Sequence, residues 1–372
     1  MSFFDFFKNK KTPQEPEPPK TREDLENTLS VHYVENVGIP SSLGVLQRAF
    51  QKQRPPQEEE KKLLKEVFDI MASVPAGKKL LDDVADMGFE VYFEAAAGQL
   101  LGSMNGSAKK LMLCPRLHTS AAAVAVTAFH EMTHAVQNEK SHRQLQDESN
   151  LNIADAIKFD RACEAAACTE EFNFAWQIKD KHPEVIKDVS QFPMWHAFAG
   201  EMEKSGDTAK AGEACFKAWY GYKHYQEIYE KQIIDNTGYN LRNRIRKNDN
   251  KAFRESISSE DTLKYAFISD DLKKNISADF LTSKEAFSIS ENAVRRLDGQ
   301  IKNYTDNFFR SVKDKSHHNM YSYQSGKTYA AQEQEQTEAP KQSMMSSLAK
   351  ISELPKAKQP ITAVLQSKEA GR

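Results

Sequence analysis

His130, Glu131 and His134 carry the strongest chemical signal in the sequence, within the segment TAFHEMTHAV at residues 127–136. If this segment is helical, two imidazoles four residues apart lie on one face and can reach the same zinc ion. Glu131 is rotated by about 100° from His130, so its carboxylate stands beside the metal. There it can take a proton from a water whose pKa zinc has lowered to about 7. The spacing therefore predicts a hydrolytic zinc site.

A zinc site of this kind needs a third protein ligand and a fourth position open to water. Glu164 is our preferred candidate, since it follows His134 by 30 residues and stands among small residues that allow two helices to approach closely. The simpler interpretation of Glu164 is a surface carboxylate paired with Arg161. Other candidates for the third ligand are Asp160, Asp155, Glu170 and, more weakly, His142.

The pattern resembles the gluzincins, a family of zinc metallopeptidases in which a Glu on the helix after HExxH completes the metal site. Residues 89–229 are also similar to bacterial domains of unknown function that are labelled metallopeptidases. Three segments carry the likeness: residues 110–113, 128–137 (AFHEMTHAVQ) and 160–167 (DRACEAAA). The resemblance implies a zincin-like core, a peptide or protein substrate, Glu131 as general base, and zinc held by His130, His134 and Glu164.

One position departs from this family pattern. In well-known gluzincins an Asp four residues after the third ligand orients a histidine, and here that position is Cys168. Asp160 or a backbone carbonyl is then expected to orient the histidines. In zincins the strand before the metal helix also binds extended peptide by strand addition, which would place Leu111–Cys114 along the substrate. An internal sheet strand is the alternative.

A transition-state oxyanion would need a hydrogen-bond donor besides the metal. Tyr220 and His224 are our candidates, because they are four residues apart and lie away from the centre of an aromatic stripe; Tyr239 is a further possibility. We interpret that stripe as core, since its members recur at spacings of three and four: Phe216, Trp219, Tyr222, Tyr225 and Tyr229.

Two other kinds of HExxH site do not fit the sequence. The metzincin pattern requires His and Gly where this chain has Lys140 and Gln137. Peptide deformylases combine HExxH with an upstream Cys, such as Cys114, but they also need sequence signatures that are missing here. A second class of function is an interaction or regulatory protein, a translocated effector included, whose zinc is structural or catalytically idle. An intact Glu131 favours the enzyme, because a structural site has no use for a general base.

Periodicity predicts a mainly helical α+β protein. An amphipathic helix begins at Glu58 and a second covers residues 77–87. Strand-like segments at 89–93, 98–104 and 110–114, with a turn at Asn105-Gly106, predict a small antiparallel sheet. Helices then follow from Ser120 to about Ile234, where Asp235–Gly238 is expected to end them.

The same patterns divide the chain into four parts. Residues 1–56 are expected to be a flexible segment with a Pro-rich linker at 12–20 and a short helical stretch after Ser41. Residues 57–240 would form the zincin-like domain, 241–321 a C-terminal helical region, and 322–372 a disordered tail. The basic run at residues 242–254 reads as a solvated segment between domains.

Composition limits the partners and the location. Lys and Arg total 51 against 53 Asp and Glu, a net charge of -2, so no overall field would attract nucleic acid. The longest apolar run, near residues 121–129, is far short of the ~20 residues of a transmembrane helix, and Met1–Lys11 does not have the form of a secretory signal. Four cysteines without CxxC spacing suit a reducing setting, and we expect a cytoplasmic protein; the oligomeric state stays open.

Overall fold

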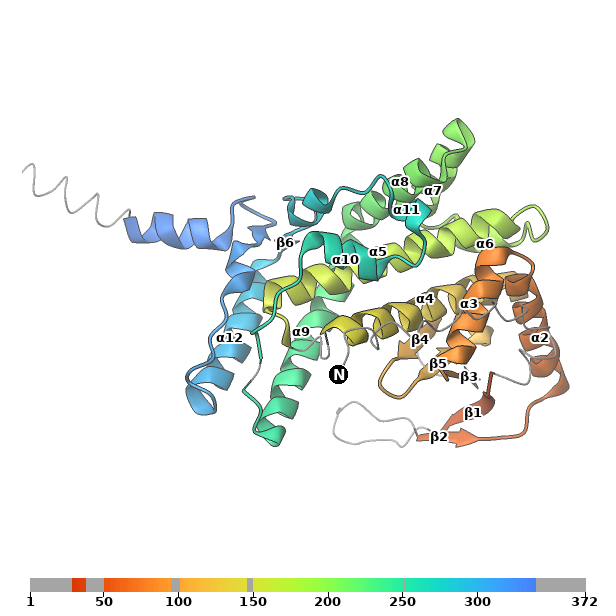
Figure 1. Cartoon of the computed structure of the whole chain (residues 1–372), viewed down its shortest axis with the longest axis horizontal. Helices are drawn as coiled ribbons and strands as arrows, with labels where there is room; N and C mark the ends of the chain where they lie inside the picture. The colour runs from red at the N-terminus through yellow and green to blue at the C-terminus, as the bar shows by residue number, and fades with distance from the viewer. Residues whose placement is uncertain (1–28, 38–49, 95–100, 146–149, 251, 339–372) are drawn as a thin grey trace, which may run out of the picture.

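The structure of this chain is a computed structural model that describes residues 29–37, 50–94, 101–145, 150–250 and 252–338. In this part the fold is mainly helical, with a small sheet beside one end of the helical body (Figure 1). The expected α+β class with helices predominant is therefore confirmed. None of the described helices combines the length and apolar character that crossing a membrane requires.

The sheet has five strands in the order β2-β1-β3-β5-β4. The central pairs β1/β3 and β3/β5 are parallel, and the outer pairs β1/β2 and β5/β4 are antiparallel. The strands are β1 (Val31–Val37), β2 (Phe50–Gln53), β3 (Glu90–Glu94), β4 (Gly102–Asn105) and β5 (Lys110–Leu113).

The predicted antiparallel sheet is wrong in its strand directions, because the sheet is mixed. β1 and β3 are joined through helices α2 (Glu58–Ala72) and α3 (Pro75–Asp86), the helical crossover that parallel neighbours need. β5 then enters between β3 and β4, so the outermost strand on this side is β4. An apolar alternation identifies a strand, but its partners depend on how the chain returns to the sheet.

The segment expected to be flexible, residues 1–56, contributes two strands. β1 and β2 lie within it, and Leu29 and Val34 are buried, because β1 pairs with β3 and brings these side chains against the protein interior. The helical stretch expected after Ser41 gives way to β2 at residues 50–53; residues 41–49 and the Pro-rich linker at 12–20 lie outside the described residues.

Helices form the rest of the body, with α4 and α5 side by side at its centre (Figure 1). The hairpin β4–β5 contacts α4, while α9 and α12 pack on each other toward the other end. The helices after the sheet are α4 (Ala121–Leu145), α5 (Ile153–Ile178), α6 (Val185–Val189), α7 (Pro193–Ser205), α8 (Thr208–Gly221), α9 (Lys223–Lys247), α10 (Ser259–Ala266), α11 (Asp270–Lys273) and α12 (Glu291–Asn307). Short 3-10 turns and strands join them: η2 (Pro115–Leu117), η4 (Ala278–Thr282), β6 (Ser288–Ile289), η5 (Ser316–Asn319) and β7 (Tyr321–Ser322).

The contact between α4 and α5 is close and antiparallel. Phe129 stacks on Phe174 with ring centroids 4.6 Å apart, while Gln137, two turns further along α4, bonds to the carbonyl of Cys163. The α5 face between them carries alanines that are completely buried, Ala162, Ala165 and Ala166. Because a methyl group takes little room, the backbones can approach and side chains such as Glu164 can reach across the interface.

The helix end predicted at Asp235–Gly238 is wrong, because α9 continues to Lys247 and crosses the boundary expected at residue 240. Gly238 serves packing: a Cβ there would lie 2.8 Å from Nε2 of Gln300 on α12. The basic run at 242–254 begins as the last turns of α9. Its Arg244 is buried and bonds to Asn150 and Asp249, whereas Arg242, Arg246 and Lys247 are exposed, so the run is solvated only in part.

The start of the tail expected to be disordered is ordered in the structure. β7 pairs with β6 in parallel, and residues 329–338 are helical. The hydroxyl of Tyr329 donates to the carbonyl of Ile289 at 3.1 Å. These pairings form with distant residues, which the polar composition of the segment does not reveal. Residues 339–372 lie outside the described part.

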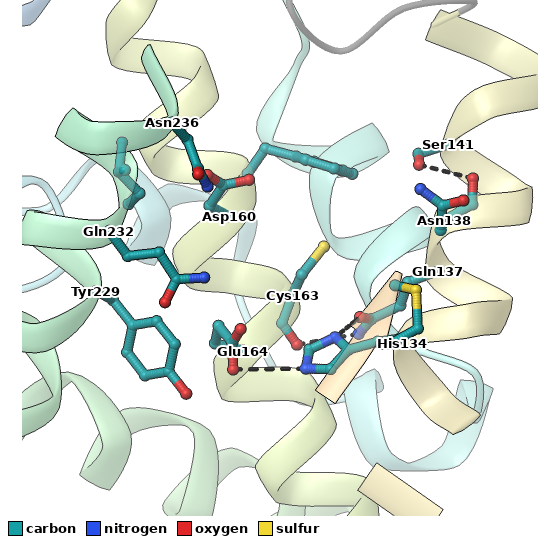
Figure 2. Close-up of a pocket in the computed structure, with 13 residues that line it drawn as sticks. His134, Gln137, Asn138, Ser141, Asp160, Cys163, Glu164, Tyr229, Gln232 and Asn236 are labelled. Carbon is teal, nitrogen blue, oxygen red and sulfur yellow. Dashed lines mark hydrogen bonds and ion pairs between the residues drawn. The ribbon is translucent and has the colours of Figure 1, made fainter. Parts of the chain in front are cut away.

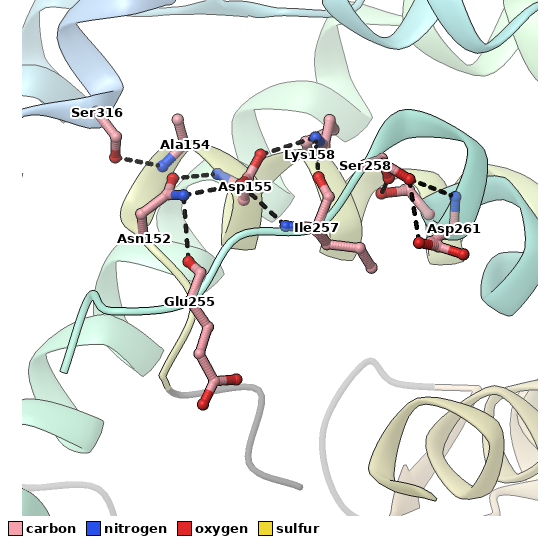
Figure 3. Close-up of polar contacts among 10 residues, drawn as sticks. Asn152, Ala154, Asp155, Lys158, Glu255, Ile257, Ser258, Asp261 and Ser316 are labelled. Atoms are coloured by element: carbon pink, nitrogen blue, oxygen red, sulfur yellow. Dashed lines mark hydrogen bonds and ion pairs between the residues drawn. The ribbon is translucent and has the colours of Figure 1, made fainter. Parts of the chain in front are cut away.

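The N-terminus of α5 is held by residues from much later in the chain (Figure 3). The side chain of Asn152 accepts from the backbone N–H of Asp155, and the Asp155 carboxylate accepts from the N–H of Ile257 at 3.1 Å. Lys158 bridges Asp155 and the Ile257 carbonyl, and the N–H of Ala154 donates to Ser316. The first-turn N–H groups of a helix need such acceptors. The C-terminal region is therefore joined to the helix that carries Glu164.

Glu170 makes a similar connection further along α5. It is only 2% exposed, and its Oε1 accepts from the backbone N–H groups of Ile268 and Ser269 at 3.0 and 2.7 Å. Burial raises the pKa of Glu170 to about 7, from an ordinary 4.5. Between these values the folded protein binds more protons than the unfolded chain, so the free energy of unfolding falls as pH rises.

Glu170→Gln should remove this pH dependence, because the amide has no proton to lose. We expect the free energy of unfolding of the wild type to fall, relative to the variant, by about 2 kcal/mol between pH 5 and pH 8. Urea unfolding with a chelator present, which excludes metal binding, measures it. Glu203→Gln, at an exposed position, is the control. Parallel pH curves for wild type and Glu170→Gln would contradict the prediction.

Candidate metal centre

Three side chains from α4 and α5 converge at the centre of the molecule. The Nε2 atoms of His130 and His134 lie 3.0 Å apart, and Oε2 of Glu164 lies 3.7 Å from the first and 3.5 Å from the second. Figure 2 shows Glu164 facing His134 across the interface between the two helices. The structure thus brings together the three residues whose spacing suggested a metal site.

The far side of each imidazole faces an acceptor. Nδ1 of His130 lies 2.9 Å from a carboxylate oxygen of Glu171, and Nδ1 of His134 lies 2.7 Å from Oε1 of Gln137. The Gln137 amide is oriented by its NH2 group, which donates to the carbonyls of Cys163 and Ala266. Both Nδ1 atoms therefore carry the ring proton, and in the neutral rings both Nε2 atoms present a lone pair.

Glu164 adds a third lone pair at the same point. Its Oε2 is buried and has no hydrogen-bond donor among the described residues. Burial acts to raise the pKa of Glu164, but the proximity of His134 and His130 holds that pKa well below its ordinary value, so the carboxylate is ionised. Two imidazole lone pairs and a carboxylate oxygen that face one point repel one another unless a proton or a metal ion lies among them. Two imidazoles and a carboxylate form a donor set that suits a divalent transition metal.

Glu131 lies beside this cluster under the edge of the sheet. A Cβ on Gly102 of β4 would lie 2.8 Å from Cγ and 3.1 Å from Oε1 of Glu131, and 2.9 Å from the Thr127 methyl group. Only glycine therefore lets the β4 backbone pass this closely over the carboxylate. Burial raises the pKa of Glu131, although both histidines oppose the shift. A raised pKa makes a carboxylate a better proton acceptor near neutral pH.

Cavities open on both sides of the cluster. One of about 160 Å³ contacts His134 and Glu164, and one of about 300 Å³ contacts His130 and Glu131. Tyr229 of α9 lines both, as Figure 2 shows for the first. A third, of about 500 Å³, shares lining residues with the first and extends along α9. The cluster therefore lies between α9 and the edge strand β4, in a cleft that solvent and ligands can enter.

Residues 45–259, more than half of the chain, match the model of a family described as "Putative metallopeptidase family (DUF6782)". The chain belongs to this family. No curated protein and no solved structure matches the chain. The matched range includes α4, α5 and α9, and a metallopeptidase family implies a metal ion.

The groups that orient the histidines in this chain are not those expected. Asp160 or a backbone carbonyl was predicted, whereas Glu171 and Gln137 occupy these places. Glu171 follows Glu164 by seven residues, two helical turns, and therefore lies on the same face of α5. That spacing was visible in the sequence and could have identified Glu171.

Tyr220 and His224 do not reach the cluster. Tyr220 is buried against Phe216, Trp219 and Phe280, and His224 is exposed. The helix is interrupted between them, since α8 ends at Gly221 and α9 begins at Lys223. The prediction that Tyr220 and His224 lie one turn apart on the same helix is therefore wrong. The break also divides the aromatic stripe. Tyr225 and Tyr229 of α9 pack against the core as predicted, and they also line the cavity beside His130. Tyr239 is exposed and lines the third cavity.

The alternative ligands have other places in the structure. Asp155 and Glu170 accept backbone N–H bonds, His142 is exposed, and Asp160 lines the first cavity without joining the cluster. The simpler interpretation of Glu164 does not hold either. Arg161 turns away from it, donating to the Ser288 carbonyl at 2.6 Å and lying 3.7 Å from Glu230.

The strand predicted to lie along the substrate is an internal strand of the sheet. Leu111–Cys114 was predicted to border the cleft, but β5 pairs with β3 on one side and β4 on the other. Leu111 and Leu113 are buried. β4, rather than β5, lies at the sheet edge beside Glu131. After β4 the chain turns back as β5, which pairs between β4 and β3.

With zinc as the probe metal, Glu171→Gln should bind the ion about 10- to 100-fold more weakly, because the carboxylate that fixes the His130 ring and raises its basicity is lost. Competition with a chromophoric chelator measures the affinity. Glu170→Gln is a matched control, since the neighbouring carboxylate faces Ile268 and Ser269 and should leave zinc affinity unchanged. Equal losses in both variants, or none in Glu171→Gln, would contradict this role.

Proposed function

We propose that this protein is a zinc-dependent peptidase in which His130, His134 and Glu164 hold the metal. The separations of 3.0, 3.5 and 3.7 Å between their donor atoms support zinc. A tetrahedron with metal–ligand bonds of about 2.0–2.1 Å has edges of about 3.3 Å, within the range of these three values. Three protein ligands beside an open cleft are typical of a catalytic zinc site.

A zincin-like core is part of this proposal. Its support is the order of elements around the metal: an edge strand, the helix with both histidines, and an antiparallel helix that contributes the glutamate. The pairing of a Glu ligand with HExxH favours a gluzincin-like site. The orienting residues Glu171 and Gln137 distinguish this chain from the gluzincin pattern with its Asp.

When bound, zinc supplies Lewis acidity that activates water and polarises the scissile carbonyl. Glu131 acts as the general base: it accepts a proton from the attacking water and then delivers that proton to the leaving nitrogen. Its position supports both transfers, since it lies beside the ligands and directly under the edge strand. Its raised pKa suits a group that must accept and release a proton in each cycle.

An extended peptide along the edge of β4 is the substrate that fits this cleft. The two ends of β4 lead to different surroundings. Near Leu101 the cavity is lined by the apolar side chains of Phe172, Phe192 and Ile228, and near Met104 it is lined by the amides of Asn138 and Asn236. Leu101 and Ile228 are 40% and 46% exposed, so the first side offers apolar surface to a substrate. We infer a preference for a large apolar residue on that side of the cleaved bond.

Tyr229 replaces Tyr220 and His224 as the proposed donor to the oxyanion. It lines both cavities, and so it borders the position of the scissile bond. Burial raises its pKa far above the ordinary 10, with the charge of Glu164 adding to the shift, so the hydroxyl keeps its proton. A protonated phenol can donate a hydrogen bond to developing negative charge.

The central test compares wild type, Glu131→Gln and Glu164→Ala. We expect equal zinc content in wild type and Glu131→Gln, about one ion per chain less in Glu164→Ala, and peptide hydrolysis only in wild type. Metal analysis and a fluorogenic peptide library give both readouts. Hydrolysis that survives Glu131→Gln would refute the mechanism, and unchanged zinc in Glu164→Ala would refute the ligand. Zinc without hydrolysis in wild type would instead indicate an idle site.

Tyr229→Phe should lower kcat by about 10²-fold with little change in KM or zinc content, because the donor acts mainly on the transition state. Steady-state kinetics on the best peptide measure this. Tyr239→Phe, on the same helix but exposed in the next cavity, should keep kcat within about twofold. A rise in KM with kcat unchanged would instead assign Tyr229 to substrate binding.

A further inference from the structure

A second group of metal-ligand side chains lies where α12 meets η5, at the opposite end of α5 from the sheet. Oδ1 of Asp298 is 2.8 Å from Nε2 of His317 and 3.0 Å from Nε2 of His318. The two rings are buried, with centroids 4.7 Å apart and planes at 82°. The rings of His130 and His134 have the same separation and angle. Two pairs of imidazoles in one chain thus share an arrangement that directs both Nε2 atoms toward one carboxylate.

The opposite side of the His318 ring faces another carboxylate. Its Nδ1 lies 3.1 Å from Oε1 of Glu333, on the helix formed by residues 329–338. A neutral ring that donates from Nδ1 presents a lone pair at Nε2, directly toward Asp298. Glu171 lies at a similar distance from Nδ1 of His130 and forms a hydrogen bond with it, whereas the Glu333 contact is an ion-pair separation without hydrogen-bond geometry. The alternative is a doubly protonated His318 that bridges the two carboxylates.

We propose that Asp298, His317 and His318 bind a second divalent transition metal, such as zinc. Two imidazoles and one carboxylate favour zinc over calcium or magnesium, which prefer oxygen ligands. Asp298 is 44% exposed, so an ion can enter from solvent although both rings are buried. The donor atoms of these three residues all lie within 4.8 Å of one another.

The location of the site indicates a structural role. Next to its histidines, Ser316 accepts the N–H of Ala154 at 3.0 Å and Asp314 accepts the N–H of Ile153 at 2.8 Å. These bonds hold the first turn of α5, the helix that carries Glu164. An ion at the second site would join α12 to η5 and so stabilise this end of α5, a role independent of peptidase activity.

Zinc stoichiometry of the full chain tests the proposal. After removal of metal with a chelator and dialysis against zinc, we expect two ions per chain in wild type. One ion should remain in His317→Ala/His318→Ala, one in His130→Ala/His134→Ala, and none in the combined variant. His196→Ala, at an exposed histidine, should retain two. A single ion in wild type, or two in His317→Ala/His318→Ala, would overturn the proposal.

A milder variant and a second readout cover the case in which the double variant does not fold. In His130→Ala/His134→Ala, zinc should raise Tm by several degrees, since an ion that binds only the folded state stabilises it. Adding Asp298→Asn, which keeps the side-chain shape, should abolish this rise. A rise that persists with Asp298→Asn would exclude these ligands. If zinc does not raise the Tm of His130→Ala/His134→Ala itself, the second site binds no metal, and a protonated His318 bridges the carboxylates of Asp298 and Glu333 instead.

Discussion

The close contact of α4 and α5 is the constraint on which the rest of the structure depends. Two imidazole nitrogens and a carboxylate oxygen meet within 3.7 Å, an arrangement that is repulsive until a cation occupies it. The buried alanines of α5 permit the approach, and the Phe129–Phe174 stack holds the other end of the interface. Packing energy from the apolar interface therefore offsets the electrostatic cost of assembling the site.

Segments far apart in the chain maintain this geometry. Gln137 connects the His134 ring to backbone carbonyls of α5 and α10, and residues 255–257 and 314–316 hold the first turn of α5. The Ala266 carbonyl and the 314–316 segment lie beyond residue 259, where the family match ends. The described C-terminal region thus supports the cleft from outside the matched range.

The buried charges of α5 are also divided among distinct partners. Arg161 faces Ser288 and Glu230, Lys158 faces Asp155, and Glu170 faces the backbone of residues 268–269. Each of these groups has partners other than Glu164, so none of them neutralises it. Buried charges need nearby partners. Since the other charged groups of α5 contact other residues, the histidines of α4 are the partners of the Glu164 carboxylate.

The sequence determined what lies along a single element. The spacing of His130, Glu131 and His134, the small residues around Glu164 and the positions of β3, β4 and β5 all follow from local periodicity. Tertiary structure decided which elements meet: the strand order, the continuation of α9 across residue 240, and the choice of Tyr229 over Tyr220 at the cleft. It also decided that Glu171 and Gln137 orient the rings. Periodicity reports the face on which a side chain lies, whereas its partner depends on loops and packing that join distant segments.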